Sequence, residues 1–175
     1  MTQTGMKKSP EMPLEPRFEN GKAMLIAGLR KHYTSETMND IPEQWQRFAV
    51  HIGKVPNEVG RVAYGVCANF VAAPFSFDYL SGVEISAAAD MPEDYSVAEI
   101  PALRYAIFSH KGHVSKIRDT IDAIWHKWLP NSGHAPVSAE ADLPYMIERY
   151  GEGFDPEKGV GDIELWIPIE DEDRN

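Results

Sequence analysis

Apolar residues along the chain follow two spacings, one typical of a helix and one typical of strands. Between residues 114 and 129 they recur every three or four positions, at Val114, Ile117, Ile121, Ile124, Trp125, Trp128 and Leu129. This stripe predicts an amphipathic helix, which Pro130 and Gly133 should end. Apolar alternation or short apolar runs predict strands over residues 103–109, 144–150 and 162–169. The second half therefore predicts the order strand, helix, strand, strand.

The first half of the chain predicts the same order of elements. The expected elements are a strand over 23–30, a helix over 41–52 and strands over 61–70 and 77–86. Pro42 suits the first turn of the helix, where its missing N–H costs nothing. A shift of 80 positions superposes landmarks without a gap: Trp45 on Trp125, Val83-Glu84-Ile85 on Ile163-Glu164-Leu165, and Val66-Cys67 on Met146-Ile147. Agreement over four successive elements predicts two tandem copies of one unit.

The predicted fold class is α+β, with duplicated strand–helix–strand–strand units. We expect antiparallel sheets with helices on one face and a ligand groove between the two halves, on the face without helices. The copies cover about 20–86 and 100–169 within a single domain, 17–169, and a polar connector, 87–97, joins them. Residues 1–16 are expected to be a flexible arm, and residues 170–175 an acidic tail.

Charge and cysteine content narrow the function classes. The chain has 17 basic and 27 acidic residues, a net charge of −10, so nucleic-acid binding is disfavoured and cationic or neutral partners are expected. The single cysteine, Cys67, excludes an internal disulfide, and its apolar surroundings favour a buried structural residue. No apolar run approaches the ~20 residues of a membrane span. We therefore expect a cytoplasmic protein. No phosphate-binding glycine-rich loop is present, and we expect no cofactor.

The last predicted strand carries an acidic side chain in an unusual place. Alternation directs Ile163, Leu165 and Ile167 to one face and leaves Glu164 beside Trp166 on the other. The first copy repeats this weakly, with Glu84 next to Gly82, whose missing side chain would let a ligand or another backbone approach. A glutamate between aromatic rings would bind a lipophilic cation. The alternative is a surface glutamate paired with a cross-strand Arg or Lys.

Two histidines, His110 and His113, are spaced as metal ligands could be, but too few other ligands accompany them. We expect them to be turn histidines and expect no metal site.

Several segments together resemble the GyrI-like effector-binding domains of AraC-type and multidrug-responsive transcription regulators. They are Arg104–Gly112, Trp125–Gly133, Tyr150–Pro156 and Gly161–Ile169, with Trp45–Phe48 and Tyr64–Val66 in the first half. The resemblance implies a duplicated fold with a ligand groove, and maps the acidic residue that contacts cationic ligands to Glu164. The arm before residue 22 is too short for a helix-turn-helix, so we expect a sensor or sequestering protein without its own DNA-binding domain.

The predicted function is binding of a small organic, cationic and amphipathic ligand rather than catalysis. The predicted ligand-binding residues are Glu164, Trp166, Glu84, Tyr145, Trp45, Tyr64, Tyr105 and Phe70. One alternative, implied by the resemblance, is a hydrolase of strained cyclopropane-containing toxins in which Glu164 is the general base. A second is an interaction protein that protects or inhibits a macromolecular partner through its acidic surface.

Overall fold

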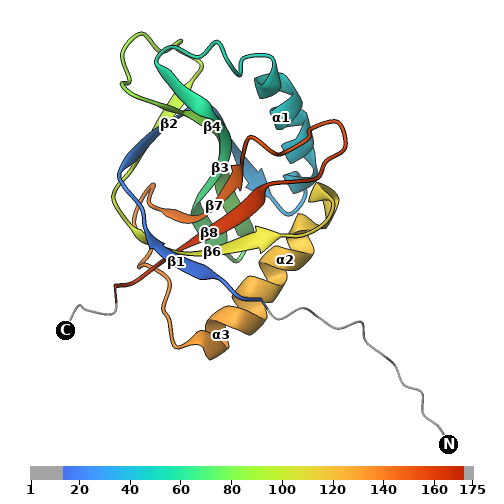
Figure 1. Ribbon diagram of the computed structural model, residues 1–175. Coiled ribbons are helices and arrows are strands. Elements are labelled where there is room, and N and C mark those ends of the chain that lie inside the picture. Colours follow the sequence, from blue (N-terminus) through green and yellow to red (C-terminus); the bar gives the residue numbers. More distant parts are fainter. Residues whose placement is uncertain (1–13, 172–175) are drawn as a thin grey trace, which may run out of the picture.

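The structure, a computed structural model, describes residues 14–171 as one antiparallel sheet with helices on one side (Figure 1). The strands are β1 (Arg17–Asn20), β2 (Met24–Thr34), β3 (Glu58–Ala72), β4 (Phe75–Ile85), β5 (Ser96–Ile100), β6 (Arg104–His110), β7 (Pro144–Tyr150) and β8 (Ile163–Ile169). The helices are α1 (Ile41–Ala49), α2 (Ile117–Ala123) and α3 (Leu129–Ser132). The α+β class, with helices on one face, is confirmed.

The two copies form two blocks of one eight-stranded sheet with the order β1-β6-β8-β7-β3-β4-β2-β5. The blocks meet where β3 of the first copy pairs with β7 of the second. Strand β1 precedes the first copy but pairs with β6 of the second, whereas β5 precedes the second copy and pairs with β2 of the first. Each copy is therefore completed by an edge strand attached to the other.

The six strands expected from the sequence are all present, but the two edge strands were not predicted. All four residues of β1 are exposed, and β5 begins inside the segment 87–97 that was assigned as a connector. Apolar alternation needs one buried and one exposed face over several residues, and β1 has no buried residue and β5 only one. Most of the predicted arm, 1–16, and of the acidic tail, 170–175, lies outside the described residues; within the arm, Leu14 packs against the core.

The gapless shift of 80 positions is wrong in the central strands. It superposes Cys67 on Ile147, yet Cys67 points toward the helices and Ile147 points to the opposite face. The residue that pairs with Cys67 across the sheet, on the same face, is Met146. Because side chains alternate with a period of two, a slip of one residue moves every side chain to the other face.

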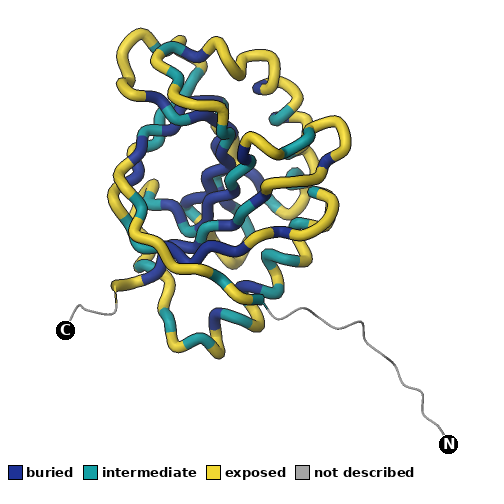
Figure 2. Tube along the Cα trace, in the orientation of Figure 1, coloured by how far each residue is buried: buried dark blue, intermediate teal, exposed yellow. Residues whose placement is uncertain are grey.

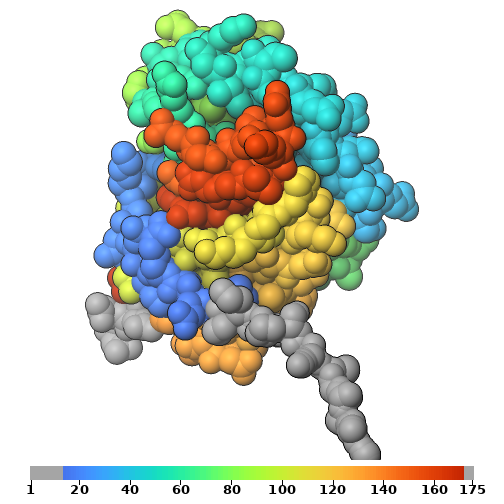
Figure 3. Space-filling view, turned by 45° about the vertical axis from the view of Figure 1, so that its right-hand side comes forward, coloured from blue at the N-terminus to red at the C-terminus, as the bar shows by residue number. Residues whose placement is uncertain are grey.

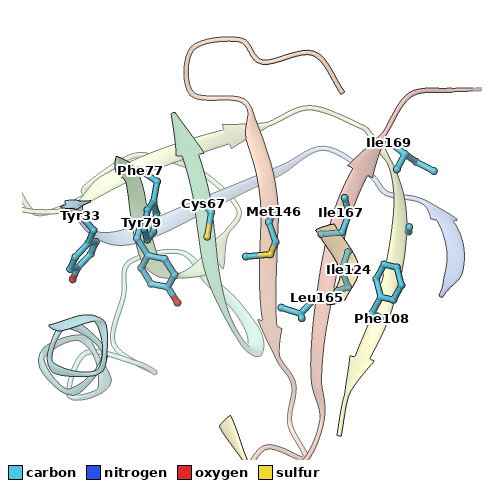
Figure 4. Close-up of a cluster of buried hydrophobic side chains, with 11 residues drawn as sticks. Tyr33, Cys67, Phe77, Tyr79, Phe108, Ile124, Met146, Leu165, Ile167 and Ile169 are labelled. Carbon is cyan, nitrogen blue, oxygen red and sulfur yellow. The ribbon is translucent and has the colours of Figure 1, made fainter. Parts of the chain in front are cut away.

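Side chains on the helix-covered face form an apolar cluster that attaches the helices to the sheet. Cys67, Met146 and Leu165 project to the same side of three strands (Figure 4). Ile124 is fully buried against them, and Trp45 of α1 packs at the edge of the cluster. This face therefore supports both helical segments.

The helix-free face closes on itself. The sheet curls, and its inner positions are buried (Figure 2). Met24 of β2 and Ile100 of β5 belong to the same apolar cluster as Tyr105 and Ile107 of β6, which lies near the other edge of the sheet. These buried side chains make the helix-free face a second core, beside which Val66, Leu80 and Ala98 line a cavity of about 440 Å³.

The second helical segment runs without a break past the residue expected to end it. A 3-10 turn, Val114–Lys116, leads into α2, and a π-helical turn, Ile124–Trp128, joins α2 to α3. Pro130 lies in the first turn of α3, where the π-turn has already interrupted the regular backbone ladder and its missing N–H is tolerated. Gly133 ends the segment in a left-handed conformation, as predicted. Within residues 14–171 no helix has the length and apolarity needed to cross a membrane.

Gly82 allows two strands to approach closely. It lies opposite Gly28 in the β2–β4 pair. A Cβ at Gly82 would lie 2.5 Å from the carbonyl oxygen of Ala27. The sequence predicted either a ligand or another backbone beside Gly82. The backbone of β2 lies there.

Replacement of Gly82 by Ala should therefore destabilise the domain. The added methyl group must push β2 away from β4, and overpacking of this kind typically costs about 1–3 kcal/mol. Urea unfolding followed by circular dichroism measures the change. Ala72→Ser, at an exposed strand end, is the control and should stay within about 0.5 kcal/mol of the wild type. A Gly82→Ala variant as stable as the control would contradict the close approach.

Candidate functional site

A groove of about 2130 Å³ lies on the helix-covered face, between α1 and the helical segment 114–132. We call it the helix-face groove. Its floor is formed by β3 and β7, which join the two copies, and by Tyr79 of β4. Residues 136–141 and the turn that includes Phe154 lie at opposite ends of β7 and line it too. In Figure 3 the orange-red segment containing this turn lies between the cyan and the yellow-gold parts of the chain.

Glu148 of β7 lies at the floor of the helix-face groove. Its Oε1 accepts hydrogen bonds from the hydroxyl of Tyr79 at 2.6 Å and from the hydroxyl of Tyr150 at 2.9 Å. The Tyr79 hydroxyl accepts a further hydrogen bond, 2.8 Å long, from Nε1 of Trp45. This chain of contacts links α1, β4 and β7, and it fixes the direction of the carboxylate.

The described residues that hold the Glu148 carboxylate are neutral. Glu148 is only 8% exposed, and burial raises its pKa, while the two tyrosine hydroxyls act against that shift by stabilising the charged form. Burial, together with the nearby Glu148 charge, raises the pKa of Tyr79 and of Tyr150, so both remain hydroxyl donors at neutral pH. Among residues 14–171 no ion pair involves Glu148. A buried negative charge without a counter-charge is costly.

Gly65 makes this arrangement sterically feasible. It faces Glu148 across the β3–β7 pair. A Cβ at position 65 would clash with the Tyr79 hydroxyl and would lie 2.8 Å from Oε1 of Glu148. Glycine therefore leaves the space through which the hydroxyl reaches the carboxylate.

Aromatic rings from both walls flank the floor. On one side Trp45 packs edge-to-face against Tyr150, with ring centroids 5.4 Å apart, and Tyr150 in turn lies 5.0 Å from Phe154. On the other side Trp125, from the π-helical turn, lies 6.1 Å from Tyr145. Because these rings are only partly buried, they offer an apolar and π-rich surface to a molecule in the groove.

The α1 wall is anchored by a buried polar side chain, Gln44. Its Oε1 accepts a hydrogen bond from Tyr33 at 2.6 Å, and its Nε2 donates to the carbonyl of Leu29 at 2.8 Å and to Ser81 Oγ at 3.0 Å. Buried polar networks that are fully satisfied fix one geometry. Trp45, the next residue, is thereby held over the floor.

Three of the predicted ligand-binding residues line the helix-face groove: Trp45, Tyr145 and Phe70. The other five, Glu164, Trp166, Glu84, Tyr64 and Tyr105, do not. The groove lies on the helix-covered face and not on the face without helices, where it was expected; that face has a smaller cavity of about 440 Å³, lined in part by Val66, Leu80 and Ala98. Trp166 packs there against Tyr105, with centroids 5.1 Å apart, and against Tyr64 at 6.3 Å.

Glu164 is paired with cations of the protein. Its Oε2 accepts a 2.9 Å hydrogen bond from Arg17, and its Oε1 lies 3.6 Å from Nη1 of Arg149. Trp166 Nε1 donates to Oε1 at 3.0 Å. Glu84, in the first copy, lies 4.0 Å from Lys22. The structure thus has the ion pair that the sequence left open as an alternative, and a ligand-binding role for Glu164 stays a prediction.

The sequence analysis missed Glu148, although a signal for it was present. Met146, Glu148 and Tyr150 share one face of the strand 144–150 by alternation, which places an acid in the middle of an apolar strand. The same argument had selected Glu164. What alternation could not provide is the hydroxyl of Tyr79, 69 positions away in the chain.

The expectation of a turn histidine is wrong for His110, which is buried at the end of β6 because its ring is hydrogen-bonded inside the fold; both histidines have structural roles. Nε2 of His110 donates to the carbonyl of His113, and Nδ1 of His110 contacts Thr120 Oγ1 at 2.8 Å. His113 accepts the backbone N–H of Ser115 at the start of the helical segment. Within the described part of the chain, no group of three or more His, Cys, Asp or Glu side chains could hold a metal ion.

A groove with a buried acid, built where two copies of a strand–helix–strand–strand unit meet, agrees with a known family. The family model of the GyrI-like small molecule binding domain matches residues 14–170. The chain belongs to this GyrI-like family. Among characterised relatives, the transcriptional regulator BrlR of Pseudomonas aeruginosa is 28% identical over 157 residues, which are 89% of this chain and 56% of BrlR. The chain thus spans little more than half the length of that relative.

Solved structures share the GyrI-like fold. The structure of SAV2435 bound to tetraphenylphosphonium has a TM-score of 0.69 and 19% identity, covering 89% of this chain and 94% of SAV2435. A putative bacterial transcription regulation protein from Staphylococcus aureus MU50 has a TM-score of 0.68 and 19% identity, covering 91% and 100% of the two chains. At this identity the likeness concerns the fold.

The buried charge of Glu148 should lower the stability of the ligand-free GyrI-like domain at neutral pH. The pKa of Glu148 is higher in the folded state than in the unfolded chain, so the folded state disfavours its ionisation. The free energy of unfolding is therefore highest at acid pH, where Glu148 is protonated, and it falls as the pH rises through the folded-state pKa. Each pKa unit corresponds to about 1.4 kcal/mol. Glu148→Gln should therefore match the wild type near pH 4 and melt at a higher temperature at pH 7.5.

Thermal melts between pH 4 and pH 8 measure this difference. A gap of about 1 kcal/mol corresponds to roughly 2–4 °C in a domain of this size. Glu152→Gln, which removes an exposed carboxylate at the rim of the same groove, is the control and should show no such growing gap. A Glu148→Gln variant that is less stable than the wild type at pH 7.5 would contradict the assignment.

Proposed function

We propose that this GyrI-like domain binds a lipophilic organic cation in the helix-face groove, with Glu148 as its counter-charge. The observation that carries the proposal is the carboxylate itself. It is buried and lies at the floor of a groove lined by aromatic rings, and within residues 14–171 its only hydrogen bonds come from the neutral hydroxyls of Tyr79 and Tyr150. A cation in the groove would supply the missing positive charge.

Two interactions favour such a ligand over a neutral one. In a partly dry site, opposite charges 4 Å apart attract by about 4 kcal/mol at an effective dielectric constant near 20. Each ring face, such as those of Trp45 and Trp125, adds about 0.5–2 kcal/mol by cation–π contact. A ligand with apolar substituents would also remove the groove walls from water. Glu148 would therefore recognise the charge of the ligand, and the aromatic rings beside it would recognise the apolar substituents.

The relatives support this ligand class. The structural neighbour SAV2435 was solved with tetraphenylphosphonium, a lipophilic cation. The relative BrlR is a transcriptional regulator. We accordingly propose that the domain acts as a sensor or a sequestering protein for such cations. Glu164 is a weaker candidate for the counter-charge, because Arg17 and Arg149 already neutralise it.

Isothermal titration calorimetry with two ions of the same shape and opposite charge tests the proposal. Tetraphenylphosphonium should bind, and tetraphenylborate should not, because the carboxylate repels the anion while the apolar contacts are equal. Glu148→Gln should weaken phosphonium binding at least tenfold, which corresponds to about 1.4 kcal/mol. Glu164→Gln is the matched control, a glutamate on the opposite face, and should change the affinity less than twofold.

Two results would overturn the proposal. One is equal affinity for phosphonium and borate, which would leave only apolar binding. The other is a loss of phosphonium affinity in Glu164→Gln together with wild-type affinity in Glu148→Gln, which would move the site to the helix-free face. Circular dichroism of both variants establishes that they are folded.

A further inference from the structure

The two oxygens of the Glu148 carboxylate have different surroundings. Both hydrogen bonds from the protein, those of Tyr79 and Tyr150, reach Oε1. No donor within the described residues reaches Oε2. Oε2 is not fully buried, and Glu148 lines the groove. A molecule in the helix-face groove therefore meets Oε2 as a free hydrogen-bond acceptor.

The described neighbours of the carboxylate neither cover Oε2 nor donate a hydrogen bond to it. Gly65, across the strand pair, has no side chain to cover it. Within residues 14–171 no hydrogen bond joins the buried Cys67 thiol, on the same face, to the carboxylate. The Trp45 N–H is taken by the Tyr79 hydroxyl. Among the described residues, neither the thiol nor the indole N–H donates to Oε2.

We propose that the preferred ligands are protonated amines, whose N–H⁺ donates a hydrogen bond to Oε2 of Glu148, rather than quaternary ions that have charge but no donor. This inference rests on the proposed function and refines its ligand class. A hydrogen bond between a charged donor and a carboxylate is short, about 2.7–2.9 Å between the heavy atoms. It contributes about 1.5–3 kcal/mol when the groups are charged. A quaternary ion leaves Oε2 unpartnered in the complex.

Charge alone predicts the opposite order of affinities. An N-methyl quaternary ion is larger than the parent ammonium ion, more apolar and less strongly hydrated, so it should enter an aromatic groove more easily. A higher affinity for the parent amine than for the quaternary ion would therefore be due to the hydrogen bond to Oε2 and not to the charge.

A matched pair of ligands tests this inference. The tricyclic tertiary amine imipramine, protonated at pH 7, and its N-methyl quaternary salt have the same rings and the same charge. We expect the wild-type domain to bind imipramine at least tenfold more tightly, by calorimetry at pH 7. Glu148→Asp keeps the charge but withdraws the carboxylate by one methylene; it should retain binding of the quaternary salt within a few-fold and lose the preference. Glu148→Gln should weaken both ligands and remove the preference.

The outcomes separate the inference from the function on which it rests. If the quaternary salt binds as tightly as imipramine or more tightly, and both depend on Glu148, the inference is overturned and cation binding stands. If neither ligand depends on Glu148, both proposals fail. A structure of the imipramine complex with the amine nitrogen within hydrogen-bond distance of Oε2 would support the inference, and one with the nitrogen away from Glu148 would overturn it.

Discussion

The constraint on which the site depends is the buried carboxylate of Glu148. Charge at this position is costly, and the protein offsets the cost with two tyrosine hydroxyls on Oε1. That arrangement determines the residues around it: Gly65 must lack a side chain, Tyr79 must stay neutral, and Trp45 must come close enough to donate to Tyr79. The carboxylate is stabilised but not neutralised within the described chain. This uncompensated charge is the basis of the proposal that the groove binds cations.

The duplication explains why the groove lies where it does. The two copies meet at the β3–β7 pair, and each copy contributes one helical wall above that junction. Exchange of the edge strands β1 and β5 ties each copy to the other, so the junction is not a hinge between separate units. The copies have diverged at the floor itself: the second contributes Glu148, whereas the first contributes Gly65 opposite it and Tyr79 beside it. A symmetric scaffold thus carries an asymmetric site.

Glu148 and Glu164 show how surroundings decide the role of a residue. Both are acids in the middle of strands of the second copy, and both accept hydrogen bonds from aromatic side chains. Glu164 faces the closed, helix-free side, where Arg17 and Arg149 balance its charge. Glu148 faces the groove and, in the described part of the chain, accepts hydrogen bonds from neutral groups only. The first arrangement stabilises the fold, and the second leaves a charge available to a ligand.

The sequence by itself determined most of the elements and their repeated order, because periodicity and turn residues act over short distances along the chain; the family came from the resemblance of its motifs. Six of the eight strands and both helical regions follow from the spacing of apolar residues, and alternation correctly separates Leu165 from Glu164 on β8. The tertiary structure alone decided which acid faces open space. The curl of the sheet brings residues of β2, β5 and β6 into one buried cluster on the helix-free side. The pairing of β3 with both β4 and β7 brings Tyr79 to Glu148. These are contacts between residues far apart in the chain, and no local pattern encodes them.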